Sequence, residues 1–203
     1  MANISFAITA HNEHIELERL LRQLAKNIKK GDEIVVQLDT TATPEVKEVV
    51  DNFSTIKQIS FALNSNFASF KNNLKLDCAK EWIFFIDADE YLSDDLMSNI
   101  HEILEANKGI VDVISVPRIN TVDNLTREHI DKWRWFVDDN GYVNYPDYQT
   151  RICANKPHIL WINKVHERLS GWKTIANLPY GYDLMHPKTI ERQEKQNKLY
   201  EQI

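Results

Sequence analysis

Residues 82–90 read WIFFIDADE, the most continuously apolar run of this chain followed at once by a group of acidic residues. A run without polar positions predicts a strand that is buried on both faces, as in the centre of a parallel sheet. The acidic group would then lie at the carboxyl edge of that sheet, where open α/β sheets bind their ligands. This stretch therefore predicts both the fold class and the position of a site.

The flanking sequence alternates strand patterns with helix patterns. The predicted strands are residues 4–9, 33–38, 56–61, 82–86 and 111–116. Between them, apolar residues recur at helical spacing. The predicted helices begin after Asn12 as an N-cap, at Pro44, at Phe67 and after Ser93. This order predicts an α/β fold with a mostly parallel central sheet that helices cover on both faces.

The second half of the chain carries shorter patterns. Residues 138–141 read DDNG, and an Asn-Gly pair favours a hairpin turn, so we expect hairpin arms at 132–137 and 142–145. We also expect strands at 149–154 and 158–162 and a polar helix over 187–203. No repeat or low-complexity linker separates the halves. A single domain over 1–203 is therefore expected, with a smaller antiparallel hairpin region in its second half.

Composition excludes several classes of protein. The 203 residues are 43% hydrophobic and 27% charged with a net charge of −6, which is typical of a globular chain and argues against nucleic acid as a partner. No stretch approaches the roughly 18 apolar residues of a membrane span, and no signal-peptide pattern is visible, so we expect a soluble cytoplasmic protein without a transmembrane segment. Neither G-x-G-x-x-G nor the P-loop pattern occurs, so a bound nucleotide would need another route.

The acidic group at 87–90 has two possible roles. Two carboxylates so close together repel each other in a cleft unless a cation or hydrogen-bond donors compensate them. A divalent ion such as Mg²⁺ or Mn²⁺ meets that need and keeps open positions for phosphate oxygens. The alternative is a solvated acidic turn that caps the next helix, and the residues alone leave both readings open.

Several blocks of the chain, taken together, resemble glycosyltransferase family 2. They are residues 4–13 (ISFAITAHNE), the strand ending in Asp39, residues 67–72 (FASFKN), residues 82–90, Arg151-Ile152, Val165-His166-Glu167 and the late His186. The last three resemble a subset of the family with a V-H-E motif. The chain departs from the usual pattern in its single acidic residue at 39–44 (DTTATP) and in lacking a clear Glu-Asp pair.

The resemblance implies a single-domain, A-type glycosyltransferase (GT-A) fold, a UDP-sugar donor, a Mn²⁺ or Mg²⁺ cofactor and a glycan or glycoconjugate acceptor. It implies a nucleotide-sugar-binding half at 1–117 and an acceptor-side half with a C-terminal helix at 118–203. A further domain or partner is expected to supply part of the acceptor recognition. The implied nucleotide-sugar-binding residues are Thr9, Ala10, His11, Glu13, Asp39, Lys71, Asn72, Asp87, Ala88, Asp89 and Arg151, and the implied metal ligands are Asp87, Asp89 and His186.

An inverting transfer also needs a carboxylate that takes the proton of the acceptor hydroxyl. Glu167 is the first candidate for this base and Asp147 the second, and His166 would orient the base or the diphosphate. Each could instead be an ordinary structural or exposed residue. The aromatic residues between 133 and 148 either form the acceptor side or pack as cross-strand pairs.

Two other functions remain open at this point. A nucleotidyltransferase also holds a metal and a nucleotide with acidic residues on an α/β sheet, but it should carry a glycine-rich basic loop near its start, where this chain reads TAHNE at 9–13. An inactive nucleotide-sugar-binding module would keep the pocket without the chemistry.

Overall fold

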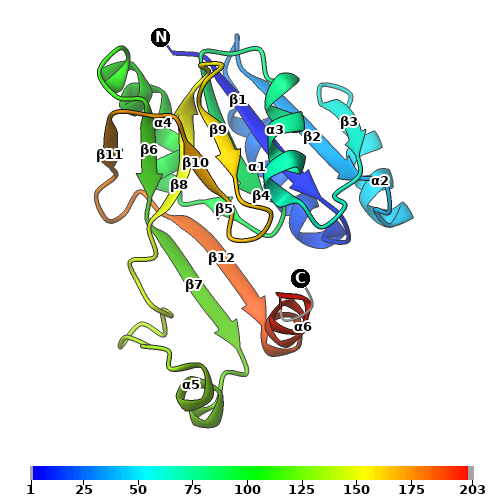
Figure 1. The fold of residues 1–203 in the computed structure, drawn as a ribbon, viewed down its shortest axis with the longest axis vertical. Helices are drawn as coiled ribbons and strands as arrows, with labels where there is room; N and C mark the ends of the chain where they lie inside the picture. The colour runs from blue at the N-terminus through cyan, green and yellow to red at the C-terminus, as the bar shows by residue number, and fades with distance from the viewer. Residues whose placement is uncertain (1, 201–203) are drawn as a thin grey trace.

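The computed structural model describes residues 2–200 and is built around a seven-stranded sheet (Figure 1). The strand order is β11-β6-β8-β4-β1-β2-β3, so the apolar strand β4 is central. The strands are β1 (Ile4–Ala10), β2 (Glu33–Asp39), β3 (Lys57–Phe61), β4 (Trp82–Asp87), β6 (Val113–Val116), β8 (Gln149–Ala154) and β11 (Ile175–Asn177). The predicted α/β fold with a mostly parallel sheet is confirmed.

Alternation along β4 divides the core into two layers. Phe84 and Ile86 point into a core formed with α1 (His14–Asn27), α2 (Pro44–Asp51) and α4 (Asp94–Asn107). Ile83 and Phe85 point into a second core with α3 (Phe67–Leu76) and the short antiparallel pair β9 (Leu160–Ile162) and β10 (Arg168–Ser170). The central strand is thus buried on both faces, as its unbroken apolar run predicted.

One strand of the main sheet is antiparallel, which the order of elements did not predict. β8 lies between β4 and β6 and runs antiparallel to both. Its bounds match the predicted strand 149–154. The sequence pattern could not show its neighbours, because the pairing joins residues some 70 positions apart along the chain: Trp82 lies opposite Ala154.

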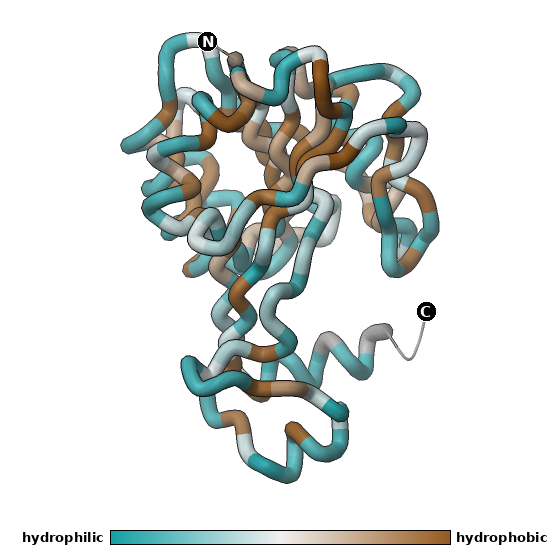
Figure 2. Tube along the Cα trace, turned by 90° about the vertical axis from the view of Figure 1, so that its left-hand side faces the viewer, coloured by the Kyte–Doolittle hydropathy of each residue, from teal (hydrophilic) through white to brown (hydrophobic). Residues whose placement is uncertain are grey.

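Below the main sheet lies a smaller part, here called the lower lobe. It contains β7 (Arg118–Asp123), α5 (Arg127–Trp133), the segment 134–146, β12 (Leu184–Thr189) and α6 (Ile190–Tyr200). β12 pairs in parallel with β7 and, near its start, antiparallel with β5 (Tyr91–Leu92). Figure 2 shows this lobe joined to the main body by a narrow waist, and its chain is mostly hydrophilic.

The predicted hairpin arms are wrong. Residues 132 and 133 belong to α5, whose start is closed by a capping box between Thr126 and His129 that the hairpin interpretation missed. The Asn-Gly turn itself is present, since Gly141 has φ +80° and its N–H donates to Asp138 O at 3.0 Å. The two arms are joined only over a short stretch, by an isolated antiparallel bridge between Val137 and Val143 and by the hydrogen bond from Asn144 N–H to Phe136 O at 2.8 Å.

The start of the final helix also differs from the prediction. Pro187 lies within β12, and α6 begins only at Ile190; residues 201–203 of the predicted helix lie outside the described residues. β5 pairs with β12 only at Leu184 and Met185, so the strand has β7 as its single partner where Pro187 occurs. A proline that lacks an N–H is tolerated at such an edge.

The start of α1 differs by one residue from the prediction. The N-cap of α1 is Glu13 rather than Asn12. The Glu13 carboxylate turns back and accepts the backbone N–H groups of His11 and Asn12 at 2.8 and 3.0 Å.

Among residues 2–200, no helix has the length and apolar character needed to cross a membrane.

Asp112 gives a prediction about the pH dependence of stability. Its carboxylate binds Lys156 Nζ at 2.6 Å and accepts the N–H of Lys173 at 2.7 Å and of Thr174 at 3.2 Å, and these contacts lower its pKa from 3.8 to about 2. Because the pKa is lower in the folded state, the stabilisation is complete above about pH 4 and is lost as the pH falls toward 2.

We expect Asp112→Asn to lose about 1.5–3 kcal/mol of unfolding free energy at pH 7, and the difference from the unmodified chain to shrink between pH 4 and pH 2. Urea unfolding across this range measures it, with the exposed Asp51→Asn as the control. A difference that stays constant from pH 7 to pH 2 would contradict this role of Asp112.

Candidate functional site

The carboxyl ends of β1, β2 and β4 meet beside a cavity of about 830 Å³. The parallel register sets Thr9 of β1 beside Asp87 of β4, and Asp39 closes β2 at the same edge. The lower lobe forms the opposite wall. The cavity is lined by these predicted site residues: Thr9, Ala10, His11, Glu13, Asp39, Lys71, Asp87, Ala88, Asp89, Asp147, Arg151, His166, Glu167 and His186.

Asn72 is the one predicted site residue that does not line this cavity. Its side-chain amide donates to Trp161 O at 2.8 Å and accepts Trp161 N–H at 2.9 Å. Both ends of the amide are therefore used to hold β9 against α3. In this structure Asn72 supports the wall of the cavity rather than facing it.

Asp87 is held by two cations. Arg151 Nη2 lies 2.5 Å from Asp87 Oδ2, and Lys71 Nζ lies 3.2 Å from Oδ1. Burial alone would raise the pKa of Asp87, but Arg151 and Lys71 outweigh it and hold that pKa well below its usual range. Both cations are themselves buried, with Lys71 4% and Arg151 5% exposed.

Glu90 completes the buried charge cluster. Its side chain is fully buried, and Oε1 accepts from Arg151 Nη2 at 2.8 Å and from Arg118 Nη1 at 3.0 Å. The other oxygen, Oε2, accepts the backbone N–H of Asp87 at 3.1 Å. Glu90 therefore fixes the end of β4 and joins Arg151 to Arg118, which enters from the lower lobe.

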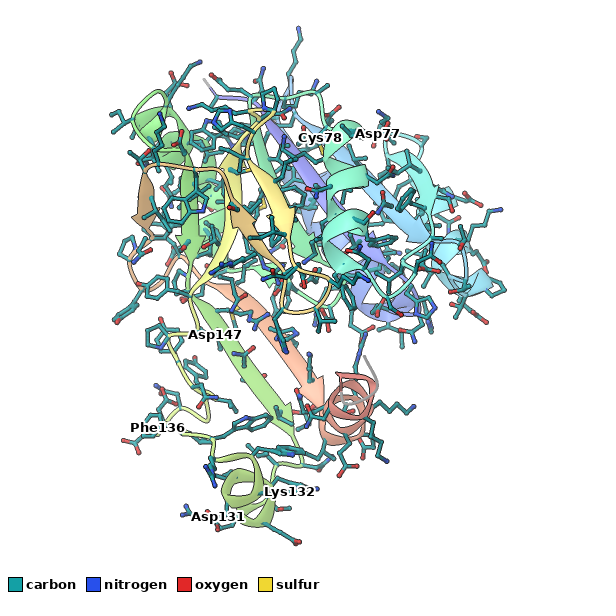
Figure 3. The ribbon with its side chains drawn as sticks, viewed as in Figure 1. Asp77, Cys78, Asp131, Lys132, Phe136 and Asp147 are labelled. Atoms are coloured by element: carbon teal, nitrogen blue, oxygen red, sulfur yellow. The ribbon has the colours of Figure 1, made fainter. Side chains whose placement is uncertain are left out.

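Asp147 is an anchored anion at the junction between the main body and the lower lobe (Figure 3). It accepts four hydrogen bonds: from Arg118 Nε at 2.9 Å and Nη2 at 2.6 Å, from Asn120 Nδ2 at 2.9 Å and from Gln149 Nε2 at 2.6 Å. Burial raises the pKa of Asp147, but these partners outweigh burial, so the net shift of the pKa is downward. A saturated carboxylate with a lowered pKa is a weak general base.

Asp89 faces His186 across the sheet edge. His186 Nε2 lies 3.4 Å from Asp89 Oδ2, and Lys188 Nζ lies 3.9 Å from the same oxygen. Burial raises the pKa of Asp89, but His186 and Lys188 outweigh it and lower that pKa strongly. β12 brings both side chains to the carboxylate, because His186 and Lys188 are two residues apart and lie on the same face of the strand.

Asn120 fixes the orientation of His186. The two residues pair directly in the β7–β12 register, and His186 Nδ1 lies 2.7 Å from Asn120 Oδ1. Because Asn120 Nδ2 donates to Asp147, its Oδ1 is the end that accepts the Nδ1–H of His186. This network leaves Nε2 of His186 directed at Asp89.

Glu167 lies near the acidic group, because the ammonium of Lys71 contacts both Glu167 and Asp87. Lys71 Nζ donates to Glu167 Oε1 at 2.8 Å, and the Glu167 side chain is 17% exposed, so solvent or a ligand can reach it. The preceding His166 is an exposed residue with φ +53°. Of the two predicted base candidates, Glu167 is paired with Lys71, whereas Asp147 already accepts four hydrogen bonds.

Asp39 marks the other end of the cavity. Its carboxylate accepts Thr41 N–H at 2.7 Å, Thr41 Oγ1–H at 2.6 Å and Leu63 N–H at 2.8 Å. Burial raises the pKa of Asp39, but these hydrogen bonds outweigh it and lower that pKa. Three donors leave room for one more on a carboxylate, which can accept about four.

Sequence reasoning missed several residues of this site. Arg118, Asn120, Lys188 and Trp172 also line the cavity. None lies in a recognisable motif. Three of the four belong to the lower lobe, and the cavity forms only when β7 and β12 pair below the main sheet, which no local pattern shows.

Comparisons with known proteins agree on the fold. The family model described as Glycosyl transferase family 2 matches residues 5–165. The structure of residues 1–349 of S. aureus TarS is similar, with a TM-score of 0.64, 14% identity and coverage of 92% of this chain and 60% of that one. TarS in complex with UDP-GlcNAc gives a TM-score of 0.64 and 15% identity, covering 93% and 59%.

A more distant likeness is the mannosyltransferase PcManGT from Pyrobaculum calidifontis in complex with GDP-Man and Mn²⁺. It has a TM-score of 0.50 and 16% identity, covering 57% of this chain and 35% of that one. The present chain therefore spans about 60% of the length of the TarS 1–349 structures. No curated protein matches the sequence at a significant level.

The buried charge cluster gives a stability prediction. Removing Arg151 leaves the Glu90 and Asp87 carboxylates undercompensated, so we expect Arg151→Met to cost about 3–5 kcal/mol of unfolding free energy. Arg127→Met removes an ion pair whose arginine side chain is 83% exposed and should change stability by less than about 0.5 kcal/mol. Chemical denaturation compares the two, and similar losses would show that the cluster is not a special contributor.

Proposed function

The chain belongs to glycosyl transferase family 2, and from that premise we propose that it transfers a sugar from a UDP-sugar to a hydroxyl group of a glycan or glycoconjugate. The observation that carries this proposal is the cavity at the ends of β1, β2 and β4, where Asp39, Asp87 and Asp89 line one continuous space. TarS, which shares the fold, binds UDP and UDP-GlcNAc in its structures.

The donor would lie along the sheet edge. Asp39 has acceptor capacity left for an N–H or O–H group of the base or the ribose. Thr9, Ala10, His11 and Glu13 would line the nucleotide pocket, with Glu13 held by its bonds to the β1–α1 loop. Lys71, Arg151 and Lys188 would provide the positive charge that a diphosphate needs.

The residues present fit a divalent ion between Asp89 and His186. A carboxylate and an imidazole nitrogen are both ligands for Mn²⁺, and His186 is oriented from behind by Asn120. Within residues 2–200, no three His, Cys, Asp or Glu side chains are grouped to hold an ion, so diphosphate oxygens and water would complete the coordination. Asp87, bound to Arg151 and Lys71, fits the role of a metal ligand less well. When bound, the ion would stabilise negative charge on the leaving diphosphate.

Glu167 is the proposed base. It lines the same cavity and is partly exposed, so the hydroxyl of an acceptor can reach its carboxylate. Lys71 links it to Asp87 and keeps it directed at the donor side. An inverting displacement would then form the new glycosidic bond as the bond to the diphosphate breaks, with the hydroxyl proton passing to Glu167.

In this proposal the two halves of the chain bind different substrates. Residues 1–117 would bind most of the donor, and residues 118–203 would bind the acceptor while also supplying Arg151 and His186. We favour a cytoplasmic enzyme. An inactive nucleotide-sugar-binding module is the alternative, and it would retain UDP binding without any effect of Glu167 on turnover.

Donor and metal binding can be tested by thermal unfolding with UDP, Mn²⁺ or both. A ligand at about 100 times its Kd stabilises a protein by about 2.7 kcal/mol, so UDP should raise Tm and Mn²⁺ should increase that shift. We expect Asp89→Asn to lose the metal-dependent part of the shift. The control is Asp123→Asn at an exposed position of β7, and a full metal-dependent shift in Asp89→Asn would refute the metal role of Asp89.

The base can be tested by substitution of the two candidates. Glu167→Gln keeps an acceptor for Lys71 but cannot take a proton, so kcat should fall about 10²–10⁴-fold with little change in UDP binding. UDP release from UDP-sugars in the presence of a glycan mixture measures turnover. Asp147→Asn should act mainly on stability; if it abolishes turnover while Glu167→Gln does not, the assignment is reversed.

A further inference from the structure

α5 is an ordered helix that adds nothing to the core. None of its residues is buried, yet its start is closed by reciprocal hydrogen bonds between Thr126 and His129. A helix of seven residues is too short to be stable through propensity alone. Its order therefore depends on local capping, and core packing does not account for it.

The helix carries a stack of aromatic rings that ends at the main cavity. The centroids of His129 and Trp133 lie 5.2 Å apart at an interplanar angle of 20°, and those of Trp133 and Trp135 lie 4.6 Å apart. Trp135 lines the main cavity. The backbone N–H of Trp135 donates to Ile130 O at 3.0 Å, which closes the end of the helix.

Arg134, between the two tryptophans, has an unusual backbone. Its φ is +55° and its ψ is 42°, a left-handed conformation in which glycine is preferred at a helix end. An arginine at such a position carries a conformational cost that a glycine would avoid, which points to a use for its side chain.

A second cavity of about 560 Å³ lies beside this stack. It is lined by Arg127, Ile130, Asp131, Arg134, Trp135, Phe136 and Val137. Trp135 lines both cavities, so the two are adjacent at this residue. Phe136 is 65% exposed, and Figure 3 shows it on the lower lobe, away from the main body.

The chemistry of the second cavity is that of a carbohydrate site. Rings offer a surface for the apolar C–H faces of sugars, and a few polar groups fix the hydroxyls. Arg127 pairs with Asp131 at 3.1 Å, and Arg134 makes no ion pair within the described part of the chain. A carboxylate that can accept hydrogen bonds, that of Asp131, and a guanidinium that can donate them, that of Arg134, therefore lie beside the exposed ring of Phe136.

We propose that this second cavity binds the sugar next to the one that is glycosylated, so that the acceptor is an oligosaccharide of at least two units. The acceptor sugar would lie on Trp135 in the main cavity, and its neighbour would lie against Phe136 and Arg134. This inference rests on the proposed function, because it takes the main cavity as the site of transfer to a hydroxyl.

The test measures saccharide binding with the full chain in the presence of UDP and Mn²⁺. The probes are glucose, galactose and N-acetylglucosamine series of one to four units, together with octyl monosaccharides, and Kd is measured by calorimetry. In one series we expect Kd to fall about tenfold from one unit to two. Phe136→Ala and Arg134→Ala should lose that gain, whereas Glu128→Gln, elsewhere on α5, should retain it.

The proposal is overturned if no saccharide binds, if Kd does not depend on length, or if the gain survives in both cavity variants. A gain from the octyl group in place of the second sugar also overturns it, since the cavity would then bind an apolar aglycone. Thermal unfolding checks that Phe136→Ala is folded. UDP binding is measured separately on the unmodified chain, and its absence would contradict the proposed function. The saccharide measurements test only whether the second cavity binds a sugar.

Discussion

The structure depends on the compensation by Arg151 of two carboxylates, the fully buried Glu90 and the partly exposed Asp87. Asp87 and Glu90 lie where the most apolar strand of the chain ends, and Glu90 is fully buried. An unpaired charge at such a position would cost a large part of the roughly 5–15 kcal/mol by which a domain is stable. Arg151 removes that cost because β8 enters the sheet antiparallel beside β4 and brings its guanidinium to both carboxylates.

The same charges join the lower lobe to the main body. Arg118 binds Glu90 on one side and Asp147 on the other, and Asp147 holds Asn120, which orients His186 toward Asp89. Each of these contacts is a hydrogen bond to a charged side chain, or to a polar side chain that is itself hydrogen-bonded to a charged one. The position of the lower lobe, and with it the far wall of the cavity, is therefore tied to the charge balance at the end of β4.

Local patterns predicted most of the main body because its elements are decided by local physics. The bounds of β8 were predicted from a short local pattern and the central burial of β4 from its run of apolar residues, and Ser93 was recognisable as an N-cap. The lower lobe was largely missed. The α5 helix depends on the capping box of Thr126 and His129, and β12 depends on pairing with β7, which overrides the tendency of Pro187 to end a strand.

The sequence by itself determined the α/β alternation, the acidic group at the end of β4 and the family to which the chain belongs, because each is written in contiguous residues. Only the tertiary structure decided that Asp87 is bound by Arg151 and Lys71 while Asp89 faces His186, that Asn72 supports β9, and that Asp147 is saturated while Glu167 is accessible. These roles depend on contacts between residues that are separated along the chain, from 16 positions for Lys71 and Asp87 to 97 for Asp89 and His186. They are fixed by strand order and by the pairing of buried charges, neither of which any local stretch of the chain contains.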